Sequence, residues 1–131
     1  MAELFQGVSW LGVIIGAVVA FVLGWLWYSP KLFGVKWAEG VGAKLGEASE
    51  MPVGAMVAQM LGLLLMSWFV GVTAVSNALF TVILATVAFT VMAYAGSMFA
   101  GNSAYARNVN AGYWLMALVV MIISQGIFRA M

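Results

Sequence analysis

Long uncharged stretches, separated by short polar segments, dominate the hydrophobic pattern of the chain. One stretch covers residues 8–28, and a second covers residues 53–99 without a single charged side chain. A straight helix over the second stretch would measure roughly 70 Å, more than twice the ~30 Å hydrocarbon core of a bilayer. We therefore expect this stretch to fold back near residues 73–77, where Ser76 and Asn77 favour a turn.

The polar segments complete the prediction of an all-α fold. Pro30 ends the first stretch because proline disfavours a helical conformation of the residue before it. Residues 31–50 hold three Lys and three Glu, so we expect a hydrophilic loop there, with a short helix around residues 35–45. Another polar segment precedes the last apolar stretch. The pattern predicts an integral membrane bundle of four helices, in a single domain that covers residues 1–131, with helices at about 8–28, 53–74, 78–99 and 111–128.

The composition supports the membrane assignment and excludes several kinds of chemistry. Charged residues make up 7% of the chain and hydrophobic residues 66%, whereas a soluble domain needs roughly 25% charged residues. His and Cys are absent, so the usual ligands of zinc, haem and iron–sulfur sites and the usual catalytic triads are missing. A net charge of +1 without a basic cluster predicts no nucleic-acid partner. We expect no cofactor, no metal and no catalytic residue.

Basic residues are concentrated in two of the polar segments. The segments 31–50 and 100–109 together hold Lys31, Lys36, Lys44 and Arg107, and the opposite side of the predicted bundle has only Arg129. Cytoplasmic loops of membrane proteins are enriched in Lys and Arg. The sequence therefore predicts a multi-pass protein with both of these segments in the cytoplasm and with its N- and C-termini outside it.

Small residues recur every four positions in two of the predicted helices. The first helix has Gly12, Gly16, Ala20 and Gly24, and the second has Gly54, Ala58 and Gly62. Small side chains let helix backbones approach closely, which matters because lipid provides no hydrophobic drive between helices. Such a face packs either on a neighbouring helix of the same chain or on another chain. Within one chain, the face of the first helix would pack on the second. If instead the second helix uses its face against the third or fourth, the face of the first is left for another chain, and on that basis we predict a homo-oligomer, most simply a dimer, with the first helix at its interface.

Aromatic residues gather at the end of the first predicted helix and in the loop that follows it. This group comprises Trp25, Trp27, Tyr28, Phe33 and Trp37, together with Pro30 and Gly34. Aromatic side chains concentrate where a helix meets the lipid headgroups, because their rings are apolar and their N–H or O–H groups bind water. An interfacial cap accounts for most of the group. The alternative is that these residues line a pocket for a lipid or a quinone-like molecule.

The same residues resemble the signature of a known family. The motif that begins at Gly24 reads G-x-x-W-Y-S-P-x-x-F-G-x-x-W, and it is similar to the opening of a small bacterial membrane family catalogued as domain of unknown function 1761. A second motif, N-V-N-A-G-Y-W from Asn108, is similar to the start of the last helix of that family. The resemblance covers residues 8–128 and implies four membrane helices with a loop after the first, in the bacterial inner membrane. It implies no activity, substrate or catalytic residue, and it adds Asn110, Tyr113 and Trp114 to the candidate cap.

Polar side chains also occur within the predicted spans, namely Gln59, Ser67, Thr86, Thr90, Ser97, Ser124 and Gln125. Hydroxyl groups can bond to their own helix, and amides commonly link neighbouring helices. The alternative is a polar path for a small solute. We favour a non-enzymatic membrane protein, a structural or accessory subunit or a homo-oligomeric helper, whose partners are the lipid bilayer and either a second copy or a membrane complex. The rival interpretation is a small transporter or channel for a neutral solute or lipid.

Overall fold

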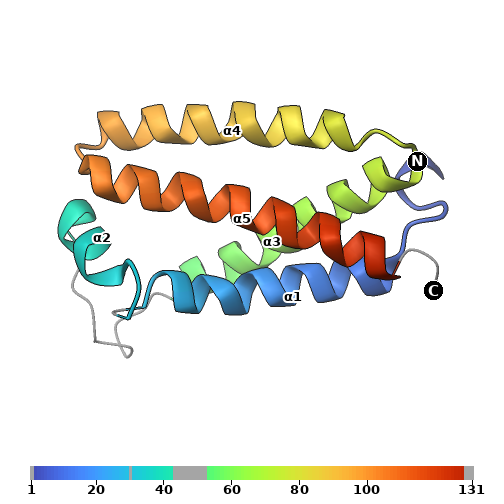
Figure 1. Cartoon of the computed structure of the whole chain (residues 1–131), viewed down its shortest axis with the longest axis horizontal. Coiled ribbons are helices and arrows are strands. Elements are labelled where there is room, and N and C mark those ends of the chain that lie inside the picture. Colours follow the sequence, from blue (N-terminus) through green and yellow to red (C-terminus); the bar gives the residue numbers. More distant parts are fainter. Residues whose placement is uncertain (1, 30, 43–52, 129–131) are drawn as a thin grey trace.

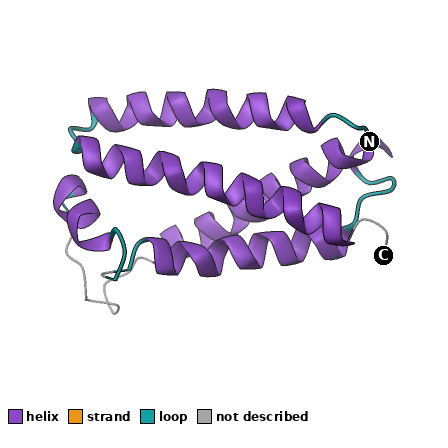
Figure 2. Cartoon of the chain, viewed as in Figure 1, coloured by secondary structure: helices purple, strands orange, loops and turns teal. Residues whose placement is uncertain are grey.

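The computed structural model describes residues 2–29, 31–42 and 53–128, and most of them are helical (Figure 1 and Figure 2). A short 3-10 helix, η1 (Ala2–Leu4), precedes five α-helices. These are α1 (Trp10–Trp27), α2 (Gly34–Val41), α3 (Val53–Val75), α4 (Leu79–Phe99) and α5 (Ala104–Phe128). No strand occurs within the described ranges.

Four of the described helices, α1, α3, α4 and α5, are long and apolar enough to cross a membrane. Their mean hydropathy lies between 1.8 and 2.2. The shortest, α1, has 18 residues, which correspond to about 27 Å along the helix axis. The short helix α2 lies at one end of the bundle (Figure 1). The prediction of an all-α membrane bundle is therefore confirmed.

The observed helix ends follow the predicted ones closely, with one exception. α5 begins at Ala104, whereas the polar composition of the segment predicts a loop up to residue 110. Ser103 caps this helix, since its hydroxyl accepts a hydrogen bond from the backbone N–H of Ala106 at 3.1 Å. The polar residues were misread because they form a helix end that extends past the apolar span. The helix predicted around residues 35–45 corresponds to α2, and residues 43–45 lie outside the described ranges.

The turn between α3 and α4 lies where the sequence predicts it. The backbone N–H of Ala78 donates to the carbonyl of Thr73 at 2.7 Å, and the N–H of Asn77 donates to the carbonyl of Ala74 at 3.4 Å. Asn77 has a φ of 54°, a left-handed conformation that asparagine tolerates better than most residues. The tight hairpin between the second and third membrane helices is therefore confirmed.

α1, α3 and α5 pack against one another, and α4 lies along the other side of α5 (Figure 1). The buried core consists of Ala17, Ala20, Leu63, Val70, Val82, Ala117, Leu118 and Met121. α1 begins and α5 ends at the same end of the bundle, where the hydroxyl of Ser9 donates to the carbonyl of Phe128 at 2.9 Å. The loop after α1 and the turn between α4 and α5 therefore share the opposite end.

The small-residue face of α1 is covered within the chain, which corrects the expectation that it is left for another copy. A Cβ atom on Gly16 would lie 3.0 Å from the hydroxyl of Ser67 in α3 and 3.3 Å from the Cβ of Ser124 in α5. Ala20 is fully buried. A Cβ atom on Gly24 would lie 2.9 Å from the hydroxyl of Tyr113, and one on Gly12 would meet the amide of Gln125. Small residues allow the close approach of helix backbones here, as they would in a dimer. In this chain, however, the neighbouring helices are α3 and α5 of the same molecule.

The small-residue face of α3 shows the opposite outcome. Gly54, Ala58 and Gly62 are exposed, and no atom lies within 4 Å of a Cβ placed on Gly54 or Gly62. The expectation that this face packs on the third or fourth membrane helix is therefore wrong. α3 contacts α1 and α5 through its other side, which carries the buried residues Leu63, Ser67 and Val70.

Candidate functional site: an aromatic cap at one end of the bundle

The chain turns sharply where α1 meets α2. The backbone N–H of Phe33 donates to the carbonyl of Trp27 at 3.2 Å, and the N–H of Gly34 donates to the carbonyl of Ser29 at 2.9 Å. A Cβ atom on Gly34 would overlap the carbonyl oxygens of Tyr28 and Ser29, so this close approach needs a glycine. The turn explains why the first motif carries a glycine directly after Phe33.

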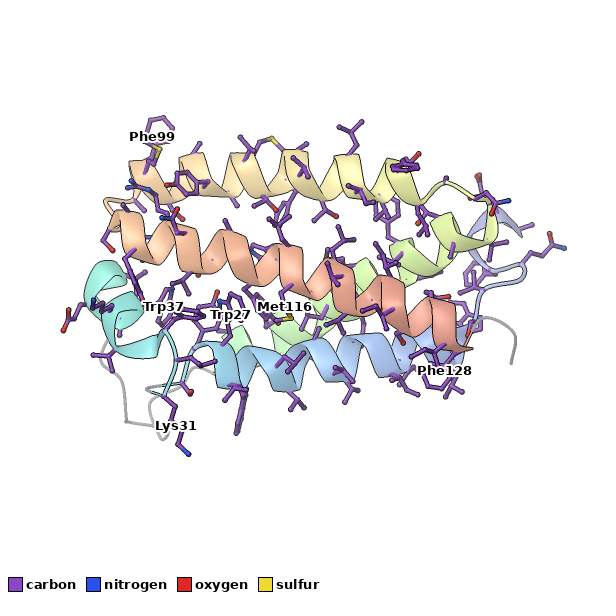
Figure 3. The ribbon with its side chains drawn as sticks, in the orientation of Figure 1. Trp27, Lys31, Trp37, Phe99, Met116 and Phe128 are labelled. Atoms are coloured by element: carbon purple, nitrogen blue, oxygen red, sulfur yellow. The ribbon has the colours of Figure 1, made fainter. Side chains whose placement is uncertain are left out.

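Five aromatic rings meet at this turn, and we call them the aromatic cap: Trp27, Tyr28, Phe33, Trp37 and Tyr113. The ring centres of Trp27 and Phe33 are 4.9 Å apart, and those of Tyr28 and Trp37 are 4.8 Å apart. Tyr28 also contacts Tyr113 of α5 at 5.6 Å, edge to face. Figure 3 shows Trp27 and Trp37 at the end of the bundle where α2 lies. Such tilted and edge-on pairs are the favoured arrangement of aromatic rings.

Hydrogen bonds within the cap join the two sequence motifs. The side-chain oxygen of Asn110 accepts one bond from the hydroxyl of Tyr28 at 2.7 Å and another from the indole N–H of Trp37 at 3.0 Å. The indole N–H of Trp27 donates to the backbone carbonyl of Val109 at 3.0 Å. One amide of α5 therefore holds the end of α1 and the middle of α2 together.

The phenol of Tyr28 acts in this network as a neutral donor. Tyr28 follows the last residue of α1 and lies outside its membrane span. Burial raises the pKa of this phenol well above its usual value of 10.0, and the neighbouring Tyr113 raises it further. The group therefore keeps its proton across the physiological pH range, as the bond to Asn110 requires.

Of the remaining candidate residues, Trp25 and Trp114 lie around the cap and not in it. Trp25 is 65% exposed, as expected for an anchor in the lipid headgroup region. Pro30 lies outside the described residues. The ring of Trp114 lies 5.5 Å from that of Tyr113 in a tilted pair and 5.3 Å from that of Phe89 of α4, edge to face, so it connects the cap to α4.

A second aromatic cluster, at the other end of the bundle, was missed by the sequence analysis. The rings of Phe5, Trp10 and Trp68 lie 5.3 to 6.1 Å apart. The indole N–H of Trp68 donates to the carbonyl of Leu4 at 2.6 Å. The available signal was weak, because Trp68 is far in sequence from Phe5 and Trp10 and meets them only when α3 packs beside α1.

Side chains of α3 and α5 donate hydrogen bonds to backbone carbonyls of α1 and of its N-cap, an arrangement that we call the carbonyl clamp. Its bonds run from Ser67 to Val13 (2.7 Å), from Ser124 to Gly12 (2.8 Å), from Tyr113 to Ala20 (2.9 Å) and from Gln125 to Ser9 (3.3 Å). The small residues on this face of α1 leave the carbonyls accessible to these donors. Bonds of this kind between membrane helices contribute about 0.6 kcal/mol each on average.

The other polar side chains of the spans do not continue the clamp. Gln59 is partly buried on α3. Thr86 and Thr90 are buried on α4, and the hydroxyl of Thr90 has no partner among the described residues. Ser97 is partly buried near the end of the same helix.

Two hollows on the surface lie outside the cap. One, of about 240 Å³, is an apolar groove between α1 and α5 lined by residues such as Ile15, Val19 and Ile123. The other, of about 290 Å³, lies between α2 and the start of α5 and is lined by Lys36, Glu39, Gly40, Ser103 and Tyr105. The described residues contain no group of three or more His, Cys, Asp or Glu side chains that could hold a metal ion.

Comparison with known proteins identifies the family of the chain. No curated protein and no solved structure matches it. A family described as a protein of unknown function (DUF1761) matches residues 11–125, a range that includes both motifs of the cap, the carbonyl clamp except for Ser9, and most of the four membrane helices. The chain therefore belongs to the DUF1761 family of proteins of unknown function.

Proposed function

We propose that this chain is a non-enzymatic integral membrane protein with a structural role, either as an accessory subunit of a membrane complex or as a homo-oligomer. The observation that supports this proposal best is the use of its polar side chains. Ser67, Ser124 and Tyr113 bind backbone carbonyls, and Asn110 binds two rings of the cap. These groups hold helices together, which supports a structural role.

The alternative function, transport of a neutral solute or lipid, would need a path along these polar groups. Within the described interior, Ser67 and Ser124 are separated from Tyr113 by Ala17, Leu63 and Met121, all fully buried. These side chains would have to move apart to open such a path. Gentle purification from native membranes distinguishes the two functions. A stoichiometric protein partner or a stable oligomer supports the structural role, whereas a lone chain that retains a small molecule between α1 and α5 contradicts it.

The structure also suggests where a homo-oligomer would form. The α1 face is covered within the chain, whereas Gly54, Ala58 and Gly62 of α3 face outward. Large apolar side chains are exposed on both α3 and α4, for example Leu61 and Phe80, so the small residues are what distinguish this face of α3. Small residues favour close helix contacts in membranes, so we place the contact between copies at α3.

Isoleucine at Gly62 should therefore dissociate the oligomer and leave the fold intact. The branched side chain would hold the two backbones apart, and inside the chain it meets open space. The measurement is the molar mass by light scattering in detergent, corrected for the micelle. Gly96→Ile is the matched control, because Gly96 of α4 is also exposed with no atom near its Cβ position. A monomeric wild type, or an oligomer that withstands Gly62→Ile, contradicts this contact.

The basic residues lead us to propose the bacterial inner membrane, with the loop after α1 in the cytoplasm and both termini outside. Single cysteines at Ala2 and Ala43 test this orientation, since the natural chain has no cysteine. An impermeant thiol reagent applied to sealed cells should label Ala2→Cys and spare Ala43→Cys. Labelling after cell lysis controls for reactivity, and the reverse pattern in sealed cells would invert the topology.

A further inference from the structure

Arg107 lies near the start of α5, at the end of the bundle that also carries α2 (Figure 1). α5 has 25 residues and is therefore about 37 Å long, some 7 Å more than the hydrocarbon core needs. Arg107 belongs to the first turn of this helix. Its guanidinium group is therefore expected at the level of the lipid phosphates, where an arginine side chain is stable only with water or a counter-ion.

The guanidinium of Arg107 is held in place by the turn before α5 and by α4. Its Nη1 donates to the backbone carbonyl of Asn102 at 2.9 Å. Its central carbon lies 5.2 Å from the centre of the Tyr94 ring, as in a cation–π contact. The hydroxyl of Tyr94 in turn donates to the side-chain oxygen of Asn108 at 3.1 Å. The position of the charge is thus set by α4 and α5 together.

This preorganised cation lacks a counter-ion among the described residues. A guanidinium offers five N–H donors, and the carbonyl of Asn102 is its one acceptor in the described chain. No residue in the described ranges accepts a hydrogen bond from its Nε atom, which is enclosed. The side-chain N–H groups of Asn108 also lack an acceptor in this part of the chain, where the exposed residue bonds through its oxygen.

We propose that Arg107 and Asn108 bind the phosphate of an anionic phospholipid of the surrounding leaflet. The charge is complementary, and a planar guanidinium matches the oxygens of a phosphate. The nearby end of α4 suits the rest of the lipid, because Met98 is 56% exposed, and Phe99 is 93% exposed and points away from the bundle (Figure 3). Apolar side chains next to an unpaired cation fit an acyl chain below its headgroup.

Lys36 provides a matched comparison at the same end of the bundle. Its ammonium lies 5.5 Å from the centre of the Tyr105 ring, so it also combines a cation with an aromatic ring. However, it shares its hollow with the carboxylate of Glu39, which repels an anion. The proposal therefore assigns the lipid to Arg107, although both residues carry one positive charge.

Native mass spectrometry of the full chain in detergent tests this site, with added phosphatidylglycerol as the probe. Arg107→Gln should weaken the apparent Kd about tenfold or more, as expected for the loss of a hydrogen bond to a charged group. Lys36→Gln, which removes the same charge, should leave the Kd nearly unchanged. Phosphatidylcholine should bind the wild type more weakly than phosphatidylglycerol, and millimolar inorganic phosphate should not displace the lipid.

Each other outcome overturns the proposal. Equal losses in Arg107→Gln and Lys36→Gln would indicate general attraction by a basic surface. Displacement by inorganic phosphate would indicate a site for a soluble anion, and equal binding of phosphatidylcholine would remove the selection for negative charge. If Arg107→Gln loses helicity by circular dichroism, Arg107→Lys decides the question. That variant keeps the charge and loses the planar fork, so it should bind more weakly, and wild-type affinity would overturn the site.

Discussion

Replacing Gly16 by isoleucine is expected to prevent the stable packing of α1 on α3 and α5. A Cβ atom at this position already lies 3.5 Å from the backbone of Met121 and closer to Ser67 and Ser124. The branches of isoleucine extend further and cannot be accommodated without moving α1 away. The overpacking should destabilise the bundle by about 3 kcal/mol or more, because the bonds of the carbonyl clamp from Ser67 and Ser124 are lost as well.

The loss should appear as a lower temperature of unfolding or aggregation in detergent, together with a lower yield of folded protein. Gly96→Ile is the matched control, since it makes the same change in a membrane helix where no atom lies near the Cβ position. That control should unfold close to the wild-type temperature. A Gly16→Ile variant that stays folded and loses only its oligomeric state would instead place the α1 face between copies.

Replacing Asn110 by leucine is expected to have the second-largest effect, because one oxygen serves two donors. The change leaves the hydroxyl of Tyr28 and the indole N–H of Trp37 without their shared acceptor. An unpaired buried donor costs about 1–3 kcal/mol. Both donors are only partly buried and water can reach them in part, so we expect a total loss of about 2–3 kcal/mol.

Thermal unfolding in detergent, followed by circular dichroism, measures this loss. Asn108→Leu is the control, since it makes the same substitution two residues away in α5. Asn108 is exposed and accepts a single bond, from Tyr94, so its loss should cost well under half as much. Similar melting of the two variants would mean that the bridge through Asn110 does not hold the cap together. Tyr28→Phe, which removes only one of the two donors, should fall between them.

The position of each membrane span could be predicted from the sequence because it depends on local properties. The bilayer requires about 20 apolar residues in one helix, and the chain changes from apolar to polar within a few residues. The hairpin at Asn77 is equally local, since a left-handed residue and its neighbours decide it. The one helix end that was predicted poorly, at Ala104, is a place where helix and apolar span do not coincide.

The composition of the cap was also readable from the sequence, but its connections were not. The two motifs lie far apart in the sequence, since Tyr28 of the first motif is separated by 82 positions from its hydrogen-bond acceptor Asn110 in the second. The aromatic residues alone could indicate that this end lies at a membrane surface. They could not indicate that a single amide joins α1, α2 and α5.

Only the tertiary structure decided which small-residue face is covered. The small residues of α1 and α3 have the same four-residue spacing, and this spacing indicates only that another helix can pack closely against them. Which helix packs there depends on how the helices are arranged around one another. In this chain α1 lies between α3 and α5, where Ser67, Ser124 and Tyr113 need its carbonyls as acceptors. The face of α3 points outward because α4, from the hairpin onward, packs mainly on α5.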